Sequence, residues 1–259
     1  MAVRFCRPMA GSSNRRVGTS LQKLSPFVWW GLGRLVGFRP LSPSPDGAIC
    51  LSGTDPMPAE VLDATSPKQQ IREQAHANRN AQEHKDEISR EIVARCMALP
   101  EYQQAKTVLF YLDVRSEVRT RNDLANALAS GKKIVVPYCV DGELELFHLE
   151  HNDELSVGMY RILEPKPELR TVAAKRVDVE EIDLIIVPGV AFDRRGGRTG
   201  HGKGYYDKML EHARPDTPLI ALAFECQLFD EIPMQDHDVF MDKIITEKAA
   251  YVGRGRSTN

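Results

Sequence analysis

The sequence predicts an α/β fold built on a mostly parallel central sheet, and three observations support this prediction. Short apolar runs rich in β-branched residues lie at 107–112, 133–138, 183–187 and 218–224, and such runs are typical of buried strands. Segments with helical spacing of apolar residues stand between several of them, and glycine or proline stands beside several of their ends. Strands that alternate with helices favour parallel pairing, because a crossover helix returns the chain to the same edge of the sheet.

The folded part is predicted to begin with a helix at Ser66 and Pro67. Serine is a favourable N-cap residue, and proline suits the first helical position. Lys68 and Arg72 follow four residues apart, so both cations project from one side of this helix. A solvated basic face is the commoner explanation of such a pair, and a binding role is the alternative. A second helix, which runs through Ile88 and Met97, is expected to end before Pro100.

The other predicted elements can be placed in chain order. They are a helix over 123–130 that ends at Gly131, an alternating strand over 143–149, a loop-rich passage over 153–164, a helix over 204–212 and a last strand over 243–246. In open α/β sheets, ligands bind beyond the carboxyl ends of the strands. Glu117 and residues 236–238 both follow strands, so they are candidate site residues. The order of the strands in the sheet is left open.

Composition excludes several classes of function. The chain has 259 residues, a net charge of −2 and a pI of about 6.4, so no general basic field favours nucleic acid. No apolar run reaches the roughly 18 residues that a membrane span needs. The cysteines are scattered, without the pairs typical of zinc sites or disulfide frameworks, and we expect a reduced, cytoplasmic setting. They are Cys6, Cys50, Cys96, Cys139 and Cys226.

Residues 1–65 differ from the rest, since they are rich in serine, glycine, proline and arginine and carry no acidic residue before Asp46. We weigh three explanations: a start codon assigned upstream of the true one at Met57, disorder without function, and a transit peptide. We therefore predict a disordered or wrongly assigned extension over 1–65, one folded domain over 66–251 and a flexible tail over 252–259.

A glycine-rich basic stretch separates the strand at 183–187 from the helix at 204–212. Five glycines lie between Gly196 and Gly204, mixed with arginine, histidine and lysine. Glycines let backbone N–H groups approach phosphate oxygens, and a helix N-terminus adds partial positive charge. The stretch therefore predicts a phosphate-binding loop, and a flexible basic surface loop is the alternative.

This loop is not an ordinary P-loop. Residues 197–203 fit the G-x-x-x-x-G-K pattern, but Gly204 stands where the Ser or Thr that holds Mg²⁺ is required. Carboxylates would then have to bind the metal, since Mg²⁺ prefers oxygen ligands and needs only one or two carboxylates beside phosphate. Asp207 and Asp238 are the best candidates, although Asp207 could instead stabilise its helix N-terminus.

Three further side chains have two explanations each. Tyr205 and Tyr206 could stack on a planar ligand or pack in the core. His201 could donate a proton or be an ordinary loop residue. The sequence shows no nucleophile with an adjacent base, so covalent acyl-enzyme chemistry is not indicated.

A family resemblance becomes specific at residues 200–207, Gly-His-Gly-Lys-Gly-Tyr-Tyr-Asp, preceded by Val-Pro-Gly-Val-Ala-Phe-Asp at 187–193. Together they resemble the signature of the 5-formyltetrahydrofolate cyclo-ligases, also called methenyltetrahydrofolate synthetases. The resemblance covers roughly residues 68 to 251. Further landmarks follow in order: Lys68-Gln-Gln-Ile-Arg72, Glu117, Tyr160-Arg-Ile-Leu-Glu-Pro165, Ala221-Leu-Ala-Phe224 and His237-Asp238. Arg161 departs from the family's usual glycine, and the helix around Arg79 lacks its usual dense arginines.

The resemblance implies a Rossmann-like three-layer fold with an N-terminal helical segment. It also implies that ATP and Mg²⁺ are needed to convert 5-formyltetrahydrofolate into 5,10-methenyltetrahydrofolate, with release of ADP and phosphate. In the family the formyl oxygen attacks the γ-phosphate of ATP, and the 10-nitrogen of the folate then displaces phosphate from the imidate phosphate as the ring closes. We expect a monomer that binds ATP and this folate but neither nucleic acid nor membrane.

The resemblance also assigns roles to individual residues. Those expected to bind ATP are Lys68, Arg72, Arg198, Thr199, Gly200, His201, Gly202, Lys203, Gly204, Tyr205 and Tyr206. Those expected to contact the folate are Leu112, Glu117, Tyr160, His201 and Tyr205. Asp207 and Asp238 are expected to hold Mg²⁺, and Lys203 and Arg198 to be catalytic through charge neutralisation.

Two other functions stay open at this point. One is a different ATP-dependent small-molecule kinase or ligase on the same fold. The other is a non-enzymatic ligand- or RNA-binding module, which the basic N-terminus and Gly253-Arg-Gly-Arg256 would suit.

Overall fold

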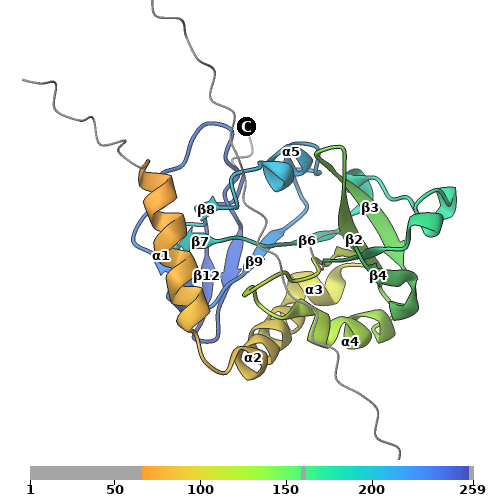
Figure 1. The fold of residues 1–259 in the computed structure, drawn as a ribbon, viewed down its shortest axis with the longest axis horizontal. Coiled ribbons are helices and arrows are strands. Elements are labelled where there is room, and N and C mark those ends of the chain that lie inside the picture. The colour runs from red at the N-terminus through yellow and green to blue at the C-terminus, as the bar shows by residue number, and fades with distance from the viewer. Residues whose placement is uncertain (1–65, 159–161, 257–259) are drawn as a thin grey trace, which may run out of the picture. The chain divides into compact units, whose positions relative to one another are not determined.

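A seven-stranded sheet in the order β12-β11-β9-β6-β1-β2-β3 dominates the computed structural model, which describes residues 66–158 and 162–256 (Figure 1). Its strands are β1 (Thr107–Leu109), β2 (Lys133–Val140), β3 (Glu143–Leu149), β6 (Leu184–Val187), β9 (Leu219–Leu222), β11 (Lys243–Ile245) and β12 (Ala250–Val252). From β11 to β2 neighbouring strands are parallel, whereas β12 and β3 pair antiparallel at the two edges. The predicted mostly parallel sheet is confirmed.

Burial explains why these segments form strands. All four residues of β6 and of β9 are buried, as expected for inner parallel strands that are covered on both faces. The run predicted as a strand over 107–112 pairs as β1 only through Leu109, although Phe110, Tyr111 and Leu112 remain buried. The end of that apolar run forms a cavity wall, which periodicity alone could not distinguish from a longer strand.

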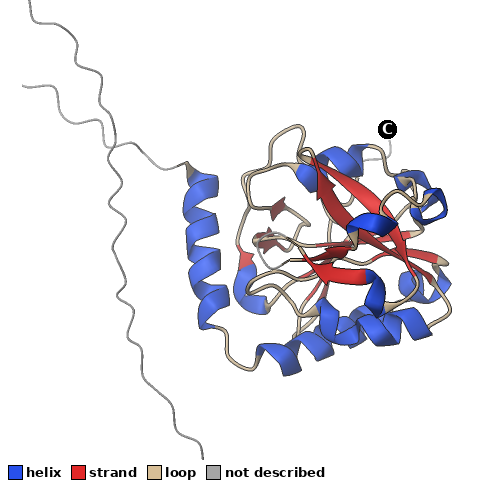
Figure 2. Cartoon of the chain, turned by 45° about the vertical axis from the view of Figure 1, so that its right-hand side comes forward, coloured by secondary structure: helices blue, strands red, loops and turns tan. Residues whose placement is uncertain are grey.

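Helices cover both faces of the sheet, which gives the predicted three layers (Figure 2). On one face lie α2 (Lys85–Met97), α3 (Pro100–Gln104) and α4 (Leu124–Ala129), and α5 (Tyr205–Glu211) packs on the other. Successive strand residues alternate between the two cores: Val108 joins the first and Leu109 the second. The short helix α3 was not predicted, because its signal is one proline followed by a single turn.

Helix α1 (Pro67–Ala81) begins as predicted, with Ser66 Oγ accepting a hydrogen bond from the Gln69 N–H at 3.3 Å. Its buried Ala75 packs with Val190 and Ala191, at the start of a small sheet. That sheet consists of β10 (Leu228–Phe229), β7 (Ala191–Asp193) and β8 (Arg198–Thr199). The helix therefore lies beside this sheet, as Figure 1 shows.

The hairpin β7–β8 corrects the sequence interpretation, which placed a single loop between the strand at 183–187 and the helix at 204–212. Buried Asp193 accepts hydrogen bonds at 2.9 Å from the backbone N–H groups of Arg195 and Gly197. Gly196 has a φ of +95°, and a Cβ on Gly197 would lie 2.5 Å from the Asp193 carboxylate. These two glycines therefore shape the hairpin turn, and the phosphate-loop candidate shortens to residues 200–204.

The passage after β3 contains a second small hairpin. Its strands are β4 (Leu155–Val157) and β5 (Leu163–Pro165), which pair antiparallel. Short 3-10 turns at 152–154, 167–169, 173–175 and 179–181 complete this loop-rich region. Tyr160 and Arg161, named in the sequence analysis, lie outside the described residues.

The described part of the predicted tail, residues 252–256, contacts the folded domain. Val252 belongs to β12, and the Gly253 N–H donates to the Asp242 carbonyl at 2.8 Å. Arg256 donates to the carbonyls of Ala213 and Thr217 at 3.0 and 2.6 Å. The guanidinium thus satisfies carbonyls near the end of α5, a common role for a cation there.

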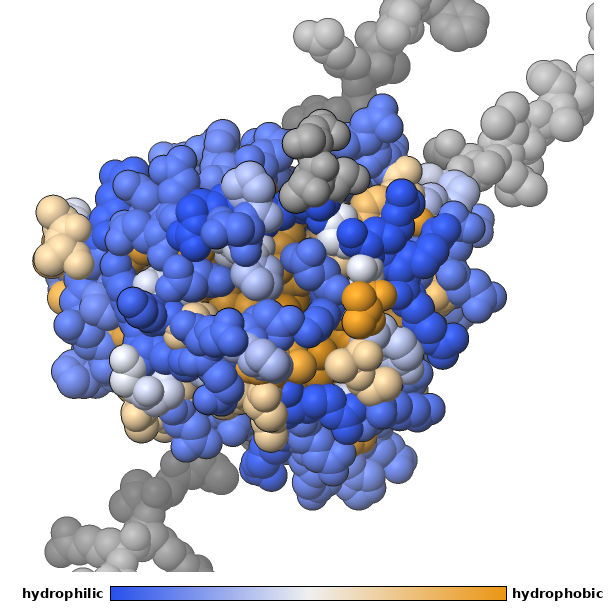
Figure 3. Space-filling model, turned by 180° about the vertical axis from the view of Figure 1, so that it is seen from behind, coloured by the Kyte–Doolittle hydropathy of each residue, from blue (hydrophilic) through white to orange (hydrophobic). Residues whose placement is uncertain are grey.

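Among residues 66–158 and 162–256, the exposed large apolar side chains are Val157, Val172 and Val252. Figure 3 shows the face opposite that of Figure 1, where hydrophilic residues predominate and hydrophobic ones are visible in patches near the centre. Among the described helices, none has the length and apolar character needed to cross a bilayer. Cys96, Cys139 and Cys226 are free thiols.

Candidate active site

The main cavity lies at the point in the sheet where the strand order reverses. From β1 the chain continues to β2 on one side, and from β6 it continues to β9 and β11 on the other. Ligands of doubly wound sheets bind at such a switch point, beyond the carboxyl ends of the strands. A cavity of about 560 Å³ opens there, lined by the segments that follow β1 and β6, by β2 and by α1. This volume is within the usual range for small-molecule sites.

The predicted site residues gather around this switch-point cavity. Its lining includes Lys68, Arg72, Leu112, Glu117, Arg198, Thr199, Gly200, His201, Gly202, Lys203, Gly204, Tyr205, Tyr206, Asp207 and Asp238. Tyr160 is the remaining predicted site residue, and it lies outside the described part of the chain. The roles assigned to these residues remain predictions.

Helix α1 contributes two of the cations. The Lys68 ammonium pairs with the Asp238 carboxylate, and both side chains are mostly buried. One turn later, Arg72 Nε donates to the Gly200 carbonyl at 2.9 Å. The commoner explanation of this i, i+4 pair, a solvated basic face, is therefore wrong, because both cations face the cavity.

The same face of α1 carries two residues that sequence reasoning missed as site residues. The His76 ring stacks on His201, with centroids 5.4 Å apart and planes at 27°. Arg79 donates to Ser116 Oγ at 2.9 Å and to the Gly189 carbonyl at 3.2 Å. Their spacing from Arg72, four and then three residues, continues one helical face, and this was the available signal.

Arg79 is the most deeply buried of these cations. Its side chain is fully buried, both of its partners are uncharged, and Nη2 has no partner among the described residues. Burial lowers the pKa of the guanidinium below its usual value, and Glu117 acts in the opposite direction. A buried cation without a directly paired carboxylate is costly, so its placement below two cavity-forming turns suggests a functional reason.

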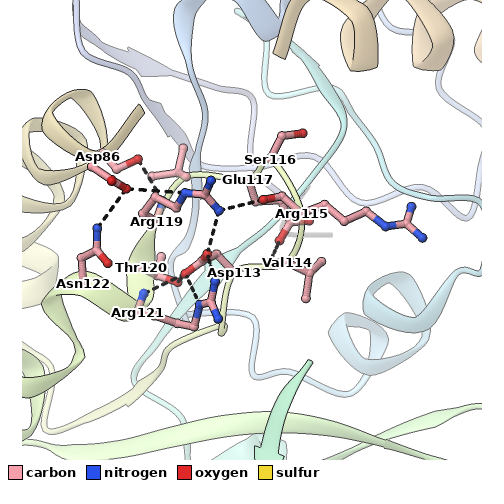
Figure 4. A network of polar contacts seen from close by, with 12 residues as sticks. Asp86, Asp113, Val114, Arg115, Ser116, Glu117, Arg119, Thr120, Arg121 and Asn122 are labelled. Atoms are coloured by element: carbon pink, nitrogen blue, oxygen red, sulfur yellow. Dashed lines mark hydrogen bonds and ion pairs between the residues drawn. The ribbon is translucent and has the colours of Figure 1, made fainter. Parts of the chain in front are cut away.

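The segment after β1 is fixed by a polar network around Asp113 (Figure 4). The fully buried Asp113 carboxylate accepts from the backbone N–H and Nε of Arg121 at 2.9 and 3.0 Å. Arg119 Nη1 lies 3.5 Å from the same carboxylate. Asp113 was not predicted as an anchor, although an aspartate directly after an apolar strand and close to two arginines is a usable signal.

This network leaves Glu117 directed at the cavity. Glu117 Oε2 accepts from the Val114 N–H at 2.9 Å, and Oε1 lies 3.5 Å from His201 Nε2. The carboxylate is buried. Glu117 is therefore a preorganised acceptor for a polar edge of a ligand.

Arg198 and Lys203, the two predicted catalytic residues, have different surroundings. The Arg198 side chain is 4% exposed and donates to Asp207 Oδ1 at 2.5 Å and to the Pro188 carbonyl at 3.3 Å. Lys203 is exposed and makes no hydrogen bond or ion pair with the other described residues. Arg198 Nε and Thr199 Oγ1 are buried without a partner in the described structure. A ligand oxygen would relieve the penalty of about 1–3 kcal/mol for such an unsatisfied group, and this fits a bound phosphate.

The two predicted metal ligands are each paired with a cation. Asp207 Oδ1 accepts from Arg198, and Asp238 Oδ2 accepts from Lys68 and, at 2.6 Å, from the Gln235 N–H. Among the described residues, no three His, Cys, Asp or Glu side chains form a group that could hold a metal ion. Two carboxylates suit Mg²⁺ only when phosphate oxygens and water complete its shell. The donor set therefore fits Mg²⁺ that arrives with a nucleotide.

Aromatic side chains form part of the cavity wall. Tyr206 and Tyr111 are in the lining, and burial raises the pKa of both phenols, with Glu117 adding to the effect. Tyr206 also packs against the core beneath α5, which agrees with the core-packing explanation; stacking on a ligand stays a prediction. The neighbouring charge of Cys139 raises the pKa of Tyr205. The phenols stay protonated at neutral pH, which suits a wall for a planar ring.

The fold and this cavity define the class: a Rossmann-like α/β protein with a cation-lined ligand site at its topological switch point. The family model described as "5-formyltetrahydrofolate cyclo-ligase family" matches residues 64–247, which is more than half of the sequence. The chain therefore belongs to the 5-formyltetrahydrofolate cyclo-ligase family and is an enzyme of that family.

Individual relatives agree with this assignment. A probable 5-formyltetrahydrofolate cyclo-ligase of Schizosaccharomyces pombe is 33% identical over 175 residues, which cover 62% of this chain and 84% of the relative. The mitochondrial 5-formyltetrahydrofolate cyclo-ligase of Arabidopsis thaliana is 28% identical over 256 residues, 88% of this chain and 91% of the relative. The NMR structure of Aquifex aeolicus 5,10-methenyltetrahydrofolate synthetase superposes with a TM-score of 0.63 at 31% identity, and covers 74% of this chain and 96% of that one.

Proposed function

We propose that this chain catalyses the ATP- and Mg²⁺-dependent cyclisation of 5-formyltetrahydrofolate to 5,10-methenyltetrahydrofolate, with release of ADP and phosphate. One observation carries the proposal: a single switch-point cavity is lined at the same time by Glu117, by the loop 200–204 and by Asp207 and Asp238. A folate, a triphosphate and a divalent cation each need one of these three parts.

The cations divide the cavity into a phosphate side and a folate side. Arg72 bonds the Gly200 carbonyl, Arg198 precedes the loop 200–204 in the chain, and Lys68 lines the same cavity; these three cations would hold the phosphates of ATP. Glu117 and Leu112 come from the segment after β1. They would contact the folate, together with Tyr205.

The proposed chemistry passes through a phosphorylated formyl group. The formyl oxygen attacks the γ-phosphate, ADP leaves, and an imidate phosphate forms. The 10-nitrogen of the folate then attacks the formyl carbon and loses its proton, and the ring closes as phosphate leaves. This reaction needs positioning and charge neutralisation rather than a protein nucleophile. Arg198 would fix the phosphate side of the cavity from its buried position, and Lys203, whose side chain is exposed, would neutralise the transferred group.

Asp207 and Asp238 would hold Mg²⁺ on the phosphate side. When bound, Mg²⁺ neutralises charge on the phosphate oxygens. The pairs that the carboxylates make with Arg198 and Lys68 keep them at the cavity wall.

The decisive assay mixes the purified chain with 5-formyltetrahydrofolate and Mg-ATP and follows methenyl absorbance together with ADP and phosphate. We expect one ADP per methenyl group formed and no product without ATP. Absence of an ATP-dependent product would contradict the proposal. Phosphorylation of another acceptor would favour a different kinase or ligase, and binding without turnover would favour a ligand-binding module.

We further propose that the enzyme works in the cytoplasm as a monomer and that residues 1–56 are not needed for activity. The family match beginning at residue 64 supports the last point. A fluorescent fusion of the full chain should be cytoplasmic; import into an organelle that residues 57–259 alone do not undergo would identify a transit peptide.

Residues 57–259 should keep turnover within about twofold of the full chain, since such remote segments rarely shift stability or activity much. Light scattering after gel filtration tests the monomer.

A further inference from the structure

Helix α1 holds two successive residues of the loop 200–204 by different means. Arg72 Nε donates a hydrogen bond to the Gly200 carbonyl at 2.9 Å. One turn later, His76 stacks its ring on the ring of His201, 5.4 Å away between centroids. The helix therefore contacts both the backbone and a side chain of the loop.

His201 needs such support, because its own surroundings leave it free to turn. Its side chain is 37% exposed, and Gly200 and Gly202 flank it. Gly202 has a φ of +86°, a conformation that glycine adopts without strain. The other described polar neighbour of His201 is Glu117, whose Oε1 lies 3.5 Å from Nε2. The ring thus lies between α1 and the buried carboxylate on the folate side.

We propose that His76 is a positioning residue: its ring holds His201 against Glu117 and so keeps the loop 200–204 over the cavity. The proposal rests on the proposed function, because the loop and Glu117 are the parts assigned to ATP and folate. His76 would touch neither ligand, and it would act through His201.

The charges around His76 favour the neutral ring that such a stack requires. Arg79 on α1 and His201 in the loop face it, together with Arg115 and Glu117 from the segment after β1. Burial lowers the pKa of His76 below 6.5, and Arg79, His201 and Arg115 add to this effect, whereas Glu117 opposes it. At neutral pH the stack therefore carries no like-charge repulsion from His76.

Three variants separate the stack from general effects on the helix. His76→Ala removes the ring, His76→Phe keeps a stacking ring without its nitrogens, and Gln74→Ala is the control on the same helix, since Gln74 is exposed and bonds only Asn78. An aromatic pair contributes roughly 0.5–1.5 kcal/mol. We therefore expect His76→Ala to raise the KM for folate or Mg-ATP about two- to tenfold, with a much smaller change in kcat. His76→Phe and Gln74→Ala should stay close to the unmodified chain.

A second measurement does not depend on activity. Amide hydrogen exchange in residues 200–204 of the ligand-free chain should be about two- to tenfold faster in His76→Ala, and unchanged in His76→Phe and Gln74→Ala. If His76→Ala does not fold, His76→Leu replaces it, because leucine keeps the helix and the apolar contact but not the ring. In a His201→Ala background, His76→Ala should add no further effect.

The outcomes separate the two proposals. A chain that makes no methenyl product contradicts the proposed function, while the exchange rates still test the stack. Unchanged exchange and unchanged KM in His76→Ala would overturn the positioning role, as would equal effects of His76→Ala and Gln74→Ala.

Discussion

Helix α1 and the loop 200–204 both line the switch-point cavity, but they are built differently. The helix is capped by Ser66 and packed through Ala75, and its cavity-facing polar residues each have a partner in another segment. The loop contains glycines with φ of +86° and +67°, at Gly202 and Gly204, and the exposed Lys203 between them. The helix is therefore organised before a ligand binds, whereas Lys203 is free to meet its ligand.

This difference predicts that the loop controls turnover and the helix controls binding. The largest effect should come from Lys203→Ala, which we expect to lower kcat about 10²- to 10³-fold, the usual result of removing a group that stabilises transition-state charge. The free energy of unfolding should barely change, because Lys203 is exposed and makes no hydrogen bond or ion pair with the other described residues. Steady-state kinetics and urea unfolding measure both. Lys208→Ala, an exposed lysine on α5, is the matched control, and a near-normal rate in Lys203→Ala would remove its assigned role.

Arg72→Ala should change the KM for ATP more than kcat. Loss of the 2.9 Å bond to Gly200 and of a cation proposed to bind phosphate should raise the KM for ATP about tenfold or more. The change in kcat should be much smaller than in Lys203→Ala. Initial rates at varied ATP give the split, and a loss confined to kcat would contradict the division between helix and loop.

Asp207→Asn should raise the Mg²⁺ concentration needed for half-maximal rate about tenfold, since one of the two proposed carboxylate ligands loses its charge. The amide can still accept from Arg198, so the fold should persist. Activity is titrated with Mg²⁺ at fixed ATP. An unchanged titration would leave Asp207 with a purely structural role at the start of α5.

The smallest expected effect is on stability in acid. The pKa of His76 is lowered below 6.5, so below that pH the unfolded chain binds more protons than the folded one. The contribution of His76 to the free energy of unfolding should be fully present above pH 6.5 and should decrease as the pH falls below 6.5. Urea unfolding at about pH 7 and about pH 5.5 measures the difference, and it should be smaller in His76→Phe. An identical pH dependence in the variant would exclude His76 as a source.

Local patterns predicted the parts of the fold that depend on local chemistry. The inner strands are continuous apolar runs, and the start of α1 depends on Ser66 and Pro67, so both could be read directly. The hairpin β7–β8 was missed because Gly196 and Gly197 have the same composition as a phosphate loop. Strand order was not predictable, since pairing between distant strands leaves no local signal.

The site residues also separate into those that a local motif predicts and those that depend on distant segments. The site residues predicted from the motif at 200–207 and its distant landmarks line one cavity wherever the structure describes them, whereas the landmark Ala221–Phe224 is not part of the lining. His76, Arg79 and Asp113 were missed because their importance depends on segments far away in sequence. Even Arg72 and Gly200, which bond directly, are 128 residues apart, and only the folded sheet brings such pairs together.

The short turn after β6 accepts hydrogen bonds both from α1 and from the residue pair before the loop 200–204. Arg198, which precedes the loop, donates to the Pro188 carbonyl, and Arg79 of α1 donates to the next carbonyl, that of Gly189. Two adjacent peptide groups thus hold both α1 and the residue pair before the loop. The relative position of helix and loop therefore depends on this one turn.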